Sequence, residues 1–301
     1  MRVLVTGANG LVGSRLVALL AARGHSVSAF GRGNRRGNGP GTYTSVDLTD
    51  ELALSEAILA VRPEVVVNAA SMTDVDVCES ASVQAFRVNG VAPGAIARST
   101  RELGAHLVQV STDYVFDGEA GPYAEEAVPN PRGVYALTKH IGEQAVRALS
   151  DSWAIARTAV VYGWPPSGRP NFGAWLVEAL RSGRPVPLFI DQYVSPSLAD
   201  SVAEQLAEVA ERRLDGIWNV CGADVVNRVQ FGEALCGVFG LSTKTIVPTP
   251  LAKANFKSPR PVHAGLRTDK AAAHLTVKPL GLAESLARFY EAVRAAEGAK
   301  T

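Results

Sequence analysis

Val5-Thr-Gly-Ala-Asn-Gly-Leu-Val-Gly13 decides the fold of this 301-residue chain. The stretch follows an apolar run at 2–6 and opens a helical pattern over 11–23. Its three glycines, Gly7, Gly10 and Gly13, let the backbone turn tightly and approach a pyrophosphate, whose charge is stabilised at a helix N-terminus. We interpret the stretch as a dinucleotide-binding loop, and the alternative is a strand–helix turn that happens to be rich in glycine. The remaining positions expected at the cofactor in this loop are Asn9, Leu11 and Val12.

Up to about residue 157, short apolar runs alternate with longer amphipathic stretches. Such alternation predicts an α/β fold, a doubly wound parallel sheet with helices on both faces. The runs are apolar throughout, as strands covered on both faces should be. The expected strands are 2–6, 26–30, 42–46, 64–68, 106–111 and 153–157, and the expected helices are 11–23, 51–61, 81–103 and 133–149.

The pattern changes after residue 160. A loop is expected over 162–170, followed by helices near 172–182, 198–213 and 229–239 that short strands and proline-rich pieces separate. We therefore divide the chain into a dinucleotide-binding domain, 1–160, and a smaller substrate-binding lobe, mainly 161–301. A segment near 196–221 is expected to return to the first domain, with 216–220 as a strand of its sheet.

Composition limits the class of protein. Hydrophobic residues make up 47% and charged residues 20% of the chain, which fits a globular protein with a sizeable core. A formal net charge of +1 favours neither nucleic acid nor a membrane surface as a partner. Cys78, Cys221 and Cys236 lack metal-ligand spacing and fit reduced thiols. We expect a soluble, cytoplasmic protein with no signal peptide, no membrane span and no metal site.

The second expected strand ends in Ala29-Phe-Gly-Arg-Gly-Asn-Arg-Arg36. An acid about 20 residues beyond the glycine loop usually binds the ribose 2′-hydroxyl of NAD. Here arginines take its place, and Arg32 is best placed to bind a 2′-phosphate, so NADPH is preferred and NADH remains possible. The alternative for these arginines is a solvated basic loop. Asp47 and Leu48 are candidates for the adenine, and Asp47 could equally be a helix N-cap or turn residue.

Two further strand ends lie at the edge of the sheet where ligands gather. Ala69, Ala70 and Ser71 are small enough to let a cofactor lie close, although a tightly packed strand–loop junction would need the same residues. Ser111 and Thr112 follow the next strand. We expect Ser111 to face the sheet or the cofactor and Thr112 to hydrogen-bond a substrate carbonyl, a turn or helix cap being the alternative.

Tyr135 and Lys139 are four residues apart in the helix expected over 133–149, so they share one face. An ammonium beside a phenol favours the phenolate, which lowers the pKa of the tyrosine. Such a pair is suited to move a proton at a carbonyl or alcohol while a bound nicotinamide moves the hydride. A tyrosine and a lysine at this spacing occur often by chance. Their position in the chain, after the glycine loop and Thr112, is what favours the catalytic interpretation.

These motifs together resemble the extended short-chain dehydrogenases/reductases, and within them the dTDP-4-dehydrorhamnose reductase group. The resemblance implies a Rossmann-type sheet and makes Tyr135 the proton donor. It also implies that Lys139 binds the nicotinamide ribose, that Thr112 orients the ketone and that Asp113 meets the sugar. The supporting segments are Thr6–Gly13, Val67–Glu79, Ser111–Gly118, Tyr135–Lys139, Arg157-Thr158, Val161–Gly163, Asp191-Gln192 and Gly216–Val220 with Gly222.

The chain departs from this group at two positions. Val160 stands where many members have a tryptophan that contacts the sugar, and Arg15 stands where some dimeric members have an acid that binds magnesium. Arg260, in a Pro-Arg-Pro segment, is a candidate for the nucleotide diphosphate, with a plain loop arginine as the alternative. Asn171 and Gln192 complete the residues expected at the substrate.

The sequence thus predicts an NADPH-dependent reductase of the 4-keto group of a nucleotide-linked deoxy sugar, acting as a monomer or homodimer. Two alternatives remain open. One is a non-catalytic nucleotide-binding subunit similar to the regulatory subunit of methionine adenosyltransferase, and the other is a sugar-nucleotide epimerase or dehydratase of the same superfamily.

Overall fold

A seven-stranded sheet forms the centre of the computed structural model, which describes residues 1–36, 39–165 and 171–298. Every pair of neighbouring strands in it is parallel, so the predicted doubly wound α/β fold is confirmed. The strands lie in the order β11 (Gly216–Asn219), β6 (Trp153–Thr158), β5 (His106–Thr112), β4 (Val65–Asn68), β1 (Arg2–Thr6), β2 (Ser26–Gly31) and β3 (Thr42–Ser45).

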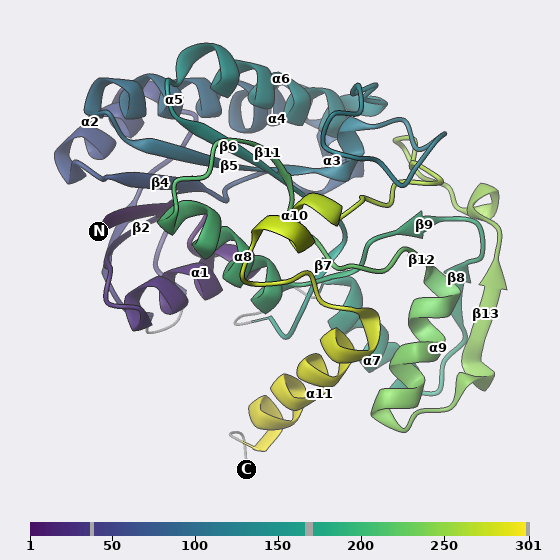
Figure 1. Ribbon diagram of the computed structural model, residues 1–301. Coiled ribbons are helices and arrows are strands. Elements are labelled where there is room, and N and C mark those ends of the chain that lie inside the picture. The colour runs from purple at the N-terminus through teal and green to yellow at the C-terminus, as the bar shows by residue number, and fades with distance from the viewer. Residues whose placement is uncertain (37–38, 166–170, 299–301) are drawn as a thin grey trace.

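Burial on both faces explains why the strands are apolar throughout. In β4, Val65 and Val67 belong to the core on one face of the sheet, and Val66 belongs to the core on the other. Helices α1 (Leu11–Ala22) and α8 (Ala199–Glu211) cover the first face, as Figure 1 shows. The opposite face is covered by α2 (Glu51–Val61), α5 (Ala92–Leu103) and α6 (Gly133–Leu149).

The helix predicted over 81–103 differs from the structure. The chain turns helical earlier, in α3 (Val75–Ser80) and α4 (Ser82–Ala85), and passes through a π-helical stretch, Phe86–Val91, before α5. Asp74 starts α3 because its carboxylate accepts a hydrogen bond from the Val77 amide. Pro93 follows the π-helical stretch and cannot donate a backbone hydrogen bond, which favours a change of helix type there.

The second half of the chain builds a separate apolar core. Helices α7 (Phe172–Arg181), α9 (Arg228–Phe239) and α11 (Leu282–Gly298) pack against β8 (Val186–Phe189), which pairs with β13 (Ile246–Thr249). Helices α7 to α9 lie within two residues of their expected ends, and residues 166–170 of the expected loop lie outside the described residues. The short elements of the described residues are β7 (Val161–Tyr162), β9 (Tyr193–Val194), β10 (Ser197–Leu198), β12 (Val226–Asn227), α10 (Asp269–His274) and the 3-10 helices Asp113–Val115, Thr243–Thr245 and Leu251–Lys253.

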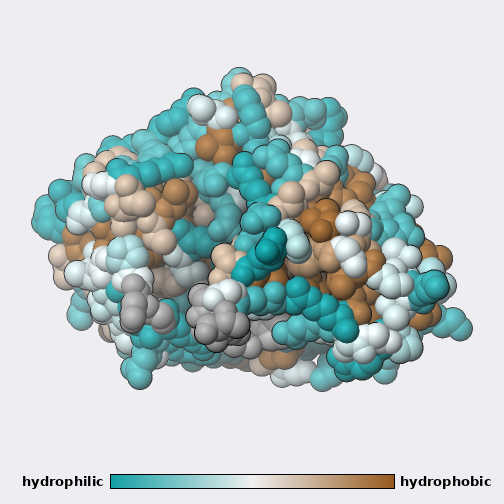
Figure 2. Space-filling model, turned by 90° about the horizontal axis from the view of Figure 1, so that it is seen from below, coloured by the Kyte–Doolittle hydropathy of each residue, from teal (hydrophilic) through white to brown (hydrophobic). Residues whose placement is uncertain are grey.

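The lobe faces the carboxyl ends of the strands because the chain returns there near its end. The His263 amide donates to the Gly118 carbonyl, and Tyr123 exchanges backbone hydrogen bonds with Gly265 and Arg267. Seen from below, the surface between the sheet on the left and the lobe on the right is hollowed (Figure 2). Among the helices that the structure describes, none has both the length and the apolar composition needed to cross a bilayer.

Candidate active site

The glycine loop touches the loop that follows β4. Gly7 has a φ of 69°, and a Cβ there would lie 2.7 Å from the backbone of Ala69. A Cβ on Gly13 would lie 2.2 Å from the Gly7 carbonyl oxygen, so the start of α1 packs directly on the loop. Gly10 precedes α1 and has no side chain to cover the first amides of the helix. Backbone amides at a helix N-terminus with no side chains over them fit a pyrophosphate, as the predicted dinucleotide requires.

Asn9 holds the arginine-containing segment 32–36 that follows β2. Its amide nitrogen donates to the carbonyls of Arg32 and Asn34, and its amide oxygen accepts from the Arg36 backbone at 2.9 Å. The Arg35 guanidinium donates to the carbonyls of Pro40 and Gly41, so it holds its own loop. Arg32 remains exposed at the end of β2, where a 2′-phosphate could reach it.

Asp47 forms a turn. Its Oδ1 accepts from the amide and the hydroxyl of Thr49, and these bonds lower the pKa of the carboxyl, to which the charge of Arg32 contributes. Asp50, and not Asp47, is the N-cap of α2. Leu48 packs on the core beneath α2. Contact of Asp47 and Leu48 with adenine stays a prediction.

Asn89 is a site residue that sequence reasoning missed. It is buried in the π-helical stretch, and its side-chain oxygen accepts from the Ser71 hydroxyl and the Met72 amide, both at 2.9 Å. Its side-chain nitrogen donates to the Met72 carbonyl at 3.0 Å. Asn89 therefore fixes the loop after β4 that contains Ala69, Ala70 and Ser71. A polar residue inside an apolar helical pattern was the signal available in the sequence.

The structure brings Thr112, Tyr135 and Lys139 to the carboxyl end of β5. Thr112 ends that strand, and Tyr135 and Lys139 lie on α6, which packs beside it. All three are buried, with exposed fractions of 5%, 8% and 3%. The Tyr135 ring meets the Tyr114 ring edge-on at 5.6 Å. Burial raises the pKa of Tyr135, and the Thr112 side chain opposes that shift.

This raised pKa differs from the lowered value that the Lys139 ammonium alone would give. The physical reason is burial, because it disfavours the charged form of both side chains. Burial lowers the pKa of Lys139 to about 8, which the carboxylate of Glu143 opposes. The ammonium donates to the Val110 carbonyl at 2.7 Å, which fixes its position beside β5.

Glu143 and Arg157 form a buried ion pair one helical turn beyond Lys139. Arg157 Nε and Nη2 donate to the two carboxylate oxygens at 3.0 and 2.8 Å. Burial alone would raise the pKa of Glu143, but His140, whose Nδ1 lies 3.9 Å from the carboxylate, and the hydrogen bonds and charge of Arg157 lower it to about 2. Ser111 contributes to this lowering, and its buried hydroxyl oxygen has no hydrogen-bond partner among the described residues, so its contact with a cofactor stays a prediction. Residues 135, 139 and 143 share a helix face, which was the sequence signal for Glu143.

Asp113 follows Thr112 and lies completely buried. Its Oδ1 accepts from the Thr112 hydroxyl at 2.9 Å. Burial raises the pKa of Asp113 to about 7, and the Thr112 hydrogen bond and the charge of Arg228 oppose the shift. Arg228, the first residue of α9, thus acts on Asp113 from the lobe, and no motif in the sequence pointed to it.

The other predicted substrate residues occupy the lobe side. Gln192 accepts from Arg228 Nε at 3.1 Å. Arg260 pairs with Asp76 at 2.9 Å, and its guanidinium lies over the Phe256 ring. Asn171 caps α7 and donates to the Gly163 carbonyl, so part of its amide serves local structure. Val160, between β6 and β7, has a φ of 38°, a strained conformation for a β-branched residue.

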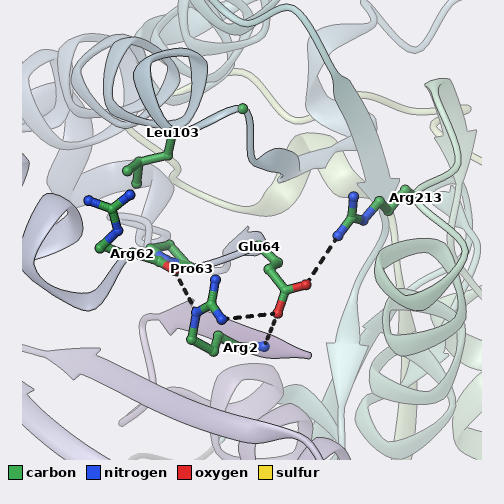
Figure 3. Close-up of a pocket in the computed structure, with 7 residues that line it drawn as sticks. Arg2, Arg62, Pro63, Glu64, Leu103 and Arg213 are labelled. Carbon is green, nitrogen blue, oxygen red and sulfur yellow. Dashed lines mark hydrogen bonds and ion pairs between the residues drawn. The ribbon is translucent and has the colours of Figure 1, made fainter.

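A pocket of about 190 Å³ at the opposite edge of the sheet is unrelated to these residues (Figure 3). Arg2, the first residue of β1, and Arg213 both pair with Glu64, as the dashed lines show. The strands begin at this edge, whereas the glycine loop and Thr112 follow strand ends. Across the described part of the chain, no group of three His, Cys, Asp or Glu side chains could hold a metal ion.

Comparison with known proteins agrees with this geometry. The model of the family described as RmlD substrate binding domain matches residues 1–295. A probable low-salt glycan biosynthesis reductase, Agl14, from Haloferax volcanii is 35% identical over 95% of this chain and 96% of its own length. A dTDP-4-dehydrorhamnose reductase from Streptomyces griseus is 41% identical over 71% of this chain and 67% of its own.

Among solved structures, a dTDP-4-dehydrorhamnose reductase from Clostridium acetobutylicum superposes with a TM-score of 0.87 at 27% identity. The superposition covers 98% of this chain and 100% of the other. Because the family model spans nearly the whole sequence, the chain belongs to the RmlD substrate binding domain family.

Proposed function

We propose that this protein reduces the 4-keto group of a nucleotide-linked deoxy sugar, with dTDP-4-dehydrorhamnose as the first substrate to test and NADPH as the preferred reductant. The observation that carries the proposal is the convergence of Thr112, Tyr135 and Lys139 on the carboxyl end of β5, at the same edge of the sheet as the glycine loop after β1, with β4 between the two strands. Arg32 supports NADPH over NADH, because a guanidinium can bind a 2′-phosphate through two hydrogen bonds.

When bound, the reduced nicotinamide supplies the hydride that adds to C4 of the sugar. Tyr135 donates its phenolic proton to the oxygen of the ketone as charge develops there. The Thr112 hydroxyl orients that oxygen. Lys139 donates to the Val110 carbonyl and lies one turn from Tyr135 on the same helix face. We expect it to bind the nicotinamide ribose there and to favour loss of the phenolic proton when the cofactor is bound.

The division into domains and the location follow from the same proposal. Residues 1–160, with the segment near 196–221, hold the cofactor, and the lobe built mainly from 161–301 holds the sugar nucleotide. Cys78, Cys221 and Cys236 are free and buried, which fits the reducing cytoplasm where NADPH is available. The protein acts as a monomer or a homodimer.

The test follows the absorbance of NADPH, and separately of NADH, with dTDP-4-dehydrorhamnose and a panel of other keto sugar nucleotides. The proposal expects NADPH oxidation that depends on the sugar nucleotide, with a higher kcat/KM for NADPH than for NADH. A purified protein that retains a stoichiometric dinucleotide and oxidises none of it would indicate an epimerase or dehydratase instead. Absence of turnover together with capture of one stoichiometric protein partner would indicate a regulatory subunit.

A further inference from the structure

A segment of the lobe without regular secondary structure, residues 256–260, lies against the short helix α3. Asp76, in the first turn of α3, bonds to this segment through both carboxylate oxygens. Oδ1 accepts from the Lys257 and Ser258 amides at 3.0 and 3.1 Å, and Oδ2 pairs with Arg260 Nη2 at 2.9 Å. One side chain of α3 thus holds a segment that lies 181 residues farther along the chain.

The same segment touches the start of α6, the helix that carries Tyr135. Gly133 is the first residue of that helix and has a φ of 84°, where a side chain would be strained. A Cβ on Gly133 would also lie 2.3 Å from Ser258 Oγ, and Ser258 is only 2% exposed. Segment 256–260 therefore packs on the helix two residues before the expected proton donor.

Segment 256–260 also lines an open cavity of about 520 Å³. It supplies the cations Lys257 and Arg260 and the Phe256 ring to the lining of this cavity. The Arg260 guanidinium lies over the Phe256 ring, 4.3 Å from its centroid, and its Nη1 donates to the Ser258 carbonyl. Guanidinium, ammonium and aromatic ring together suit an anionic ligand that contains a flat ring, as a nucleotide does.

The ion pair of Asp76 with Arg260 is partly withdrawn from water. The Arg260 and Asp76 side chains are 11% and 31% exposed, against 56% and 74% in the pair Arg267–Asp269. Solvent therefore screens the first pair less than the second. Burial would raise the pKa of Asp76, but the amides of the segment and the Arg260 guanidinium lower it, so the carboxylate stays charged at neutral pH.

We propose that Asp76 is a positioning residue for the sugar nucleotide. It holds segment 256–260 on α3, and the Arg260 guanidinium and the Phe256 ring are thereby fixed at the wall of the cavity before the substrate binds. Groups fixed in advance bind more tightly, because less side-chain and loop entropy is lost on binding. The inference rests on the proposed function and adds the residue that holds one wall of its substrate site.

The test measures binding of dTDP to the protein loaded with NADP⁺, and KM for the keto sugar nucleotide that wild type reduces. Asp76→Ala should raise both constants about 5–50-fold, because the charged hydrogen bonds that hold the segment are lost. The kcat and the Kd for NADPH should stay within about threefold of wild type. Asp76→Asn keeps an acceptor for the amides but not the charge, so its constants should lie between those of wild type and Asp76→Ala.

Hydrogen exchange reports the position of the segment directly. In Asp76→Ala without ligand, the amides of Lys257 and Ser258 have lost their acceptor, so a peptide spanning residues 254–262 should exchange faster than in wild type. Peptides from β1 should keep the wild-type rate. The matched control Asp269→Asn, which breaks the exposed pair with Arg267, should behave as wild type in every measurement.

The remaining outcomes contradict the inference in different ways. A lower Kd for dTDP in Asp76→Ala would show that the carboxylate competes with the ligand for Arg260. Weaker NADPH binding or loss of cooperative unfolding in both Asp76 variants would make the residue structural. If wild type reduces a keto sugar nucleotide and Asp76→Ala has the same KM and the same Kd for dTDP, the inference alone fails. If wild type binds no dTDP and reduces no keto sugar nucleotide, the proposed function fails and this inference fails with it.

Discussion

The two walls of the cleft are built differently. The sheet wall presents Thr112, Tyr135 and Lys139 from one strand and the helix beside it, and the buried Glu143–Arg157 pair lies beneath them. The lobe wall gathers Gln192, Arg228 and Arg260 from three distant segments, and their contacts are mostly between side chains.

This difference separates reaction from recognition. Proton transfer requires donor and acceptor within hydrogen-bond reach, which a buried strand–helix pair maintains well. Recognition of a particular sugar can change through single side chains on the lobe while the reacting wall stays the same. Val160, at the passage from β6 to β7, joins the two walls, and its strained backbone lies at that junction.

The largest effect is expected on the sheet wall, at the proton donor. Tyr135→Phe should lower kcat about 10²–10⁴-fold, because the phenol supplies the proton to the ketone oxygen. NADPH oxidation measures turnover, and fluorescence titration should give an unchanged Kd for NADPH. Tyr290→Phe in α11 serves as the control. Turnover of the Tyr135 variant within tenfold of wild type would contradict the proton-donor role.

The second-largest effect is expected at the buried Glu143–Arg157 ion pair of the sheet wall, on stability and not on turnover. Glu143→Gln leaves the buried Arg157 guanidinium without its countercharge, and we expect a loss of about 3–5 kcal/mol in the free energy of unfolding. Urea denaturation measures it. Glu284→Gln breaks the exposed pair with Arg288 and should cost less than about 1 kcal/mol. Similar losses in the two variants would show that the buried pair has no special role.

The charge of Lys139 should set the alkaline side of the pH profile. Burial lowers the pKa of this ammonium from 10.5 to about 8, so it loses its proton as the pH rises through that value. kcat/KM should then fall about tenfold per pH unit above it. Lys139→Arg keeps the charge and should move the decline to higher pH. A profile that is flat up to pH about 10 would exclude a need for the ammonium.

The same shift has a consequence for stability with a definite sign. Between pH 8 and 10.5 the unfolded chain binds more protons at Lys139 than the folded one. The contribution of Lys139 to the free energy of unfolding should therefore rise with pH across that window, and it is lost as the pH falls through about 8. The difference between wild type and Lys139→Met, measured by urea denaturation at both ends of the window, isolates it.

The smallest effect is expected at the junction of the walls. A left-handed conformation costs a residue other than glycine about 1–2 kcal/mol, and Val160→Gly removes that cost. Glycine loses more backbone entropy on folding, so we expect a net change between zero and a gain of about 1 kcal/mol. Val247→Gly, on the exposed strand β13, should instead lose about 0.5–1 kcal/mol. Equal losses would show that Val160 is unstrained.

Local patterns predicted most of the sheet wall. The glycine loop, the apolar strands and the spacing of Tyr135 and Lys139 are each readable within one or two elements, because period and turn chemistry are local properties. The helix predicted over 81–103 was wrong in its details, because the side chain of Asn89 bonds to the loop after β4 within the π-helical stretch. Helix α11 was not predicted, although its apolar face closes the lobe core.

The sequence by itself determined the parallel sheet, the order of the motifs along it and the pairing of a phenol with an amine on one helix face. Only the tertiary structure decided that burial raises the pKa of Tyr135, that Glu143 pairs with Arg157 beyond Lys139, and that the charge of Arg228 acts on the buried Asp113. The physical reason is how far apart along the chain the interacting residues lie. Periodicity and turns depend on residues close in the chain, whereas desolvation and charge pairing depend on which distant residues exclude water together.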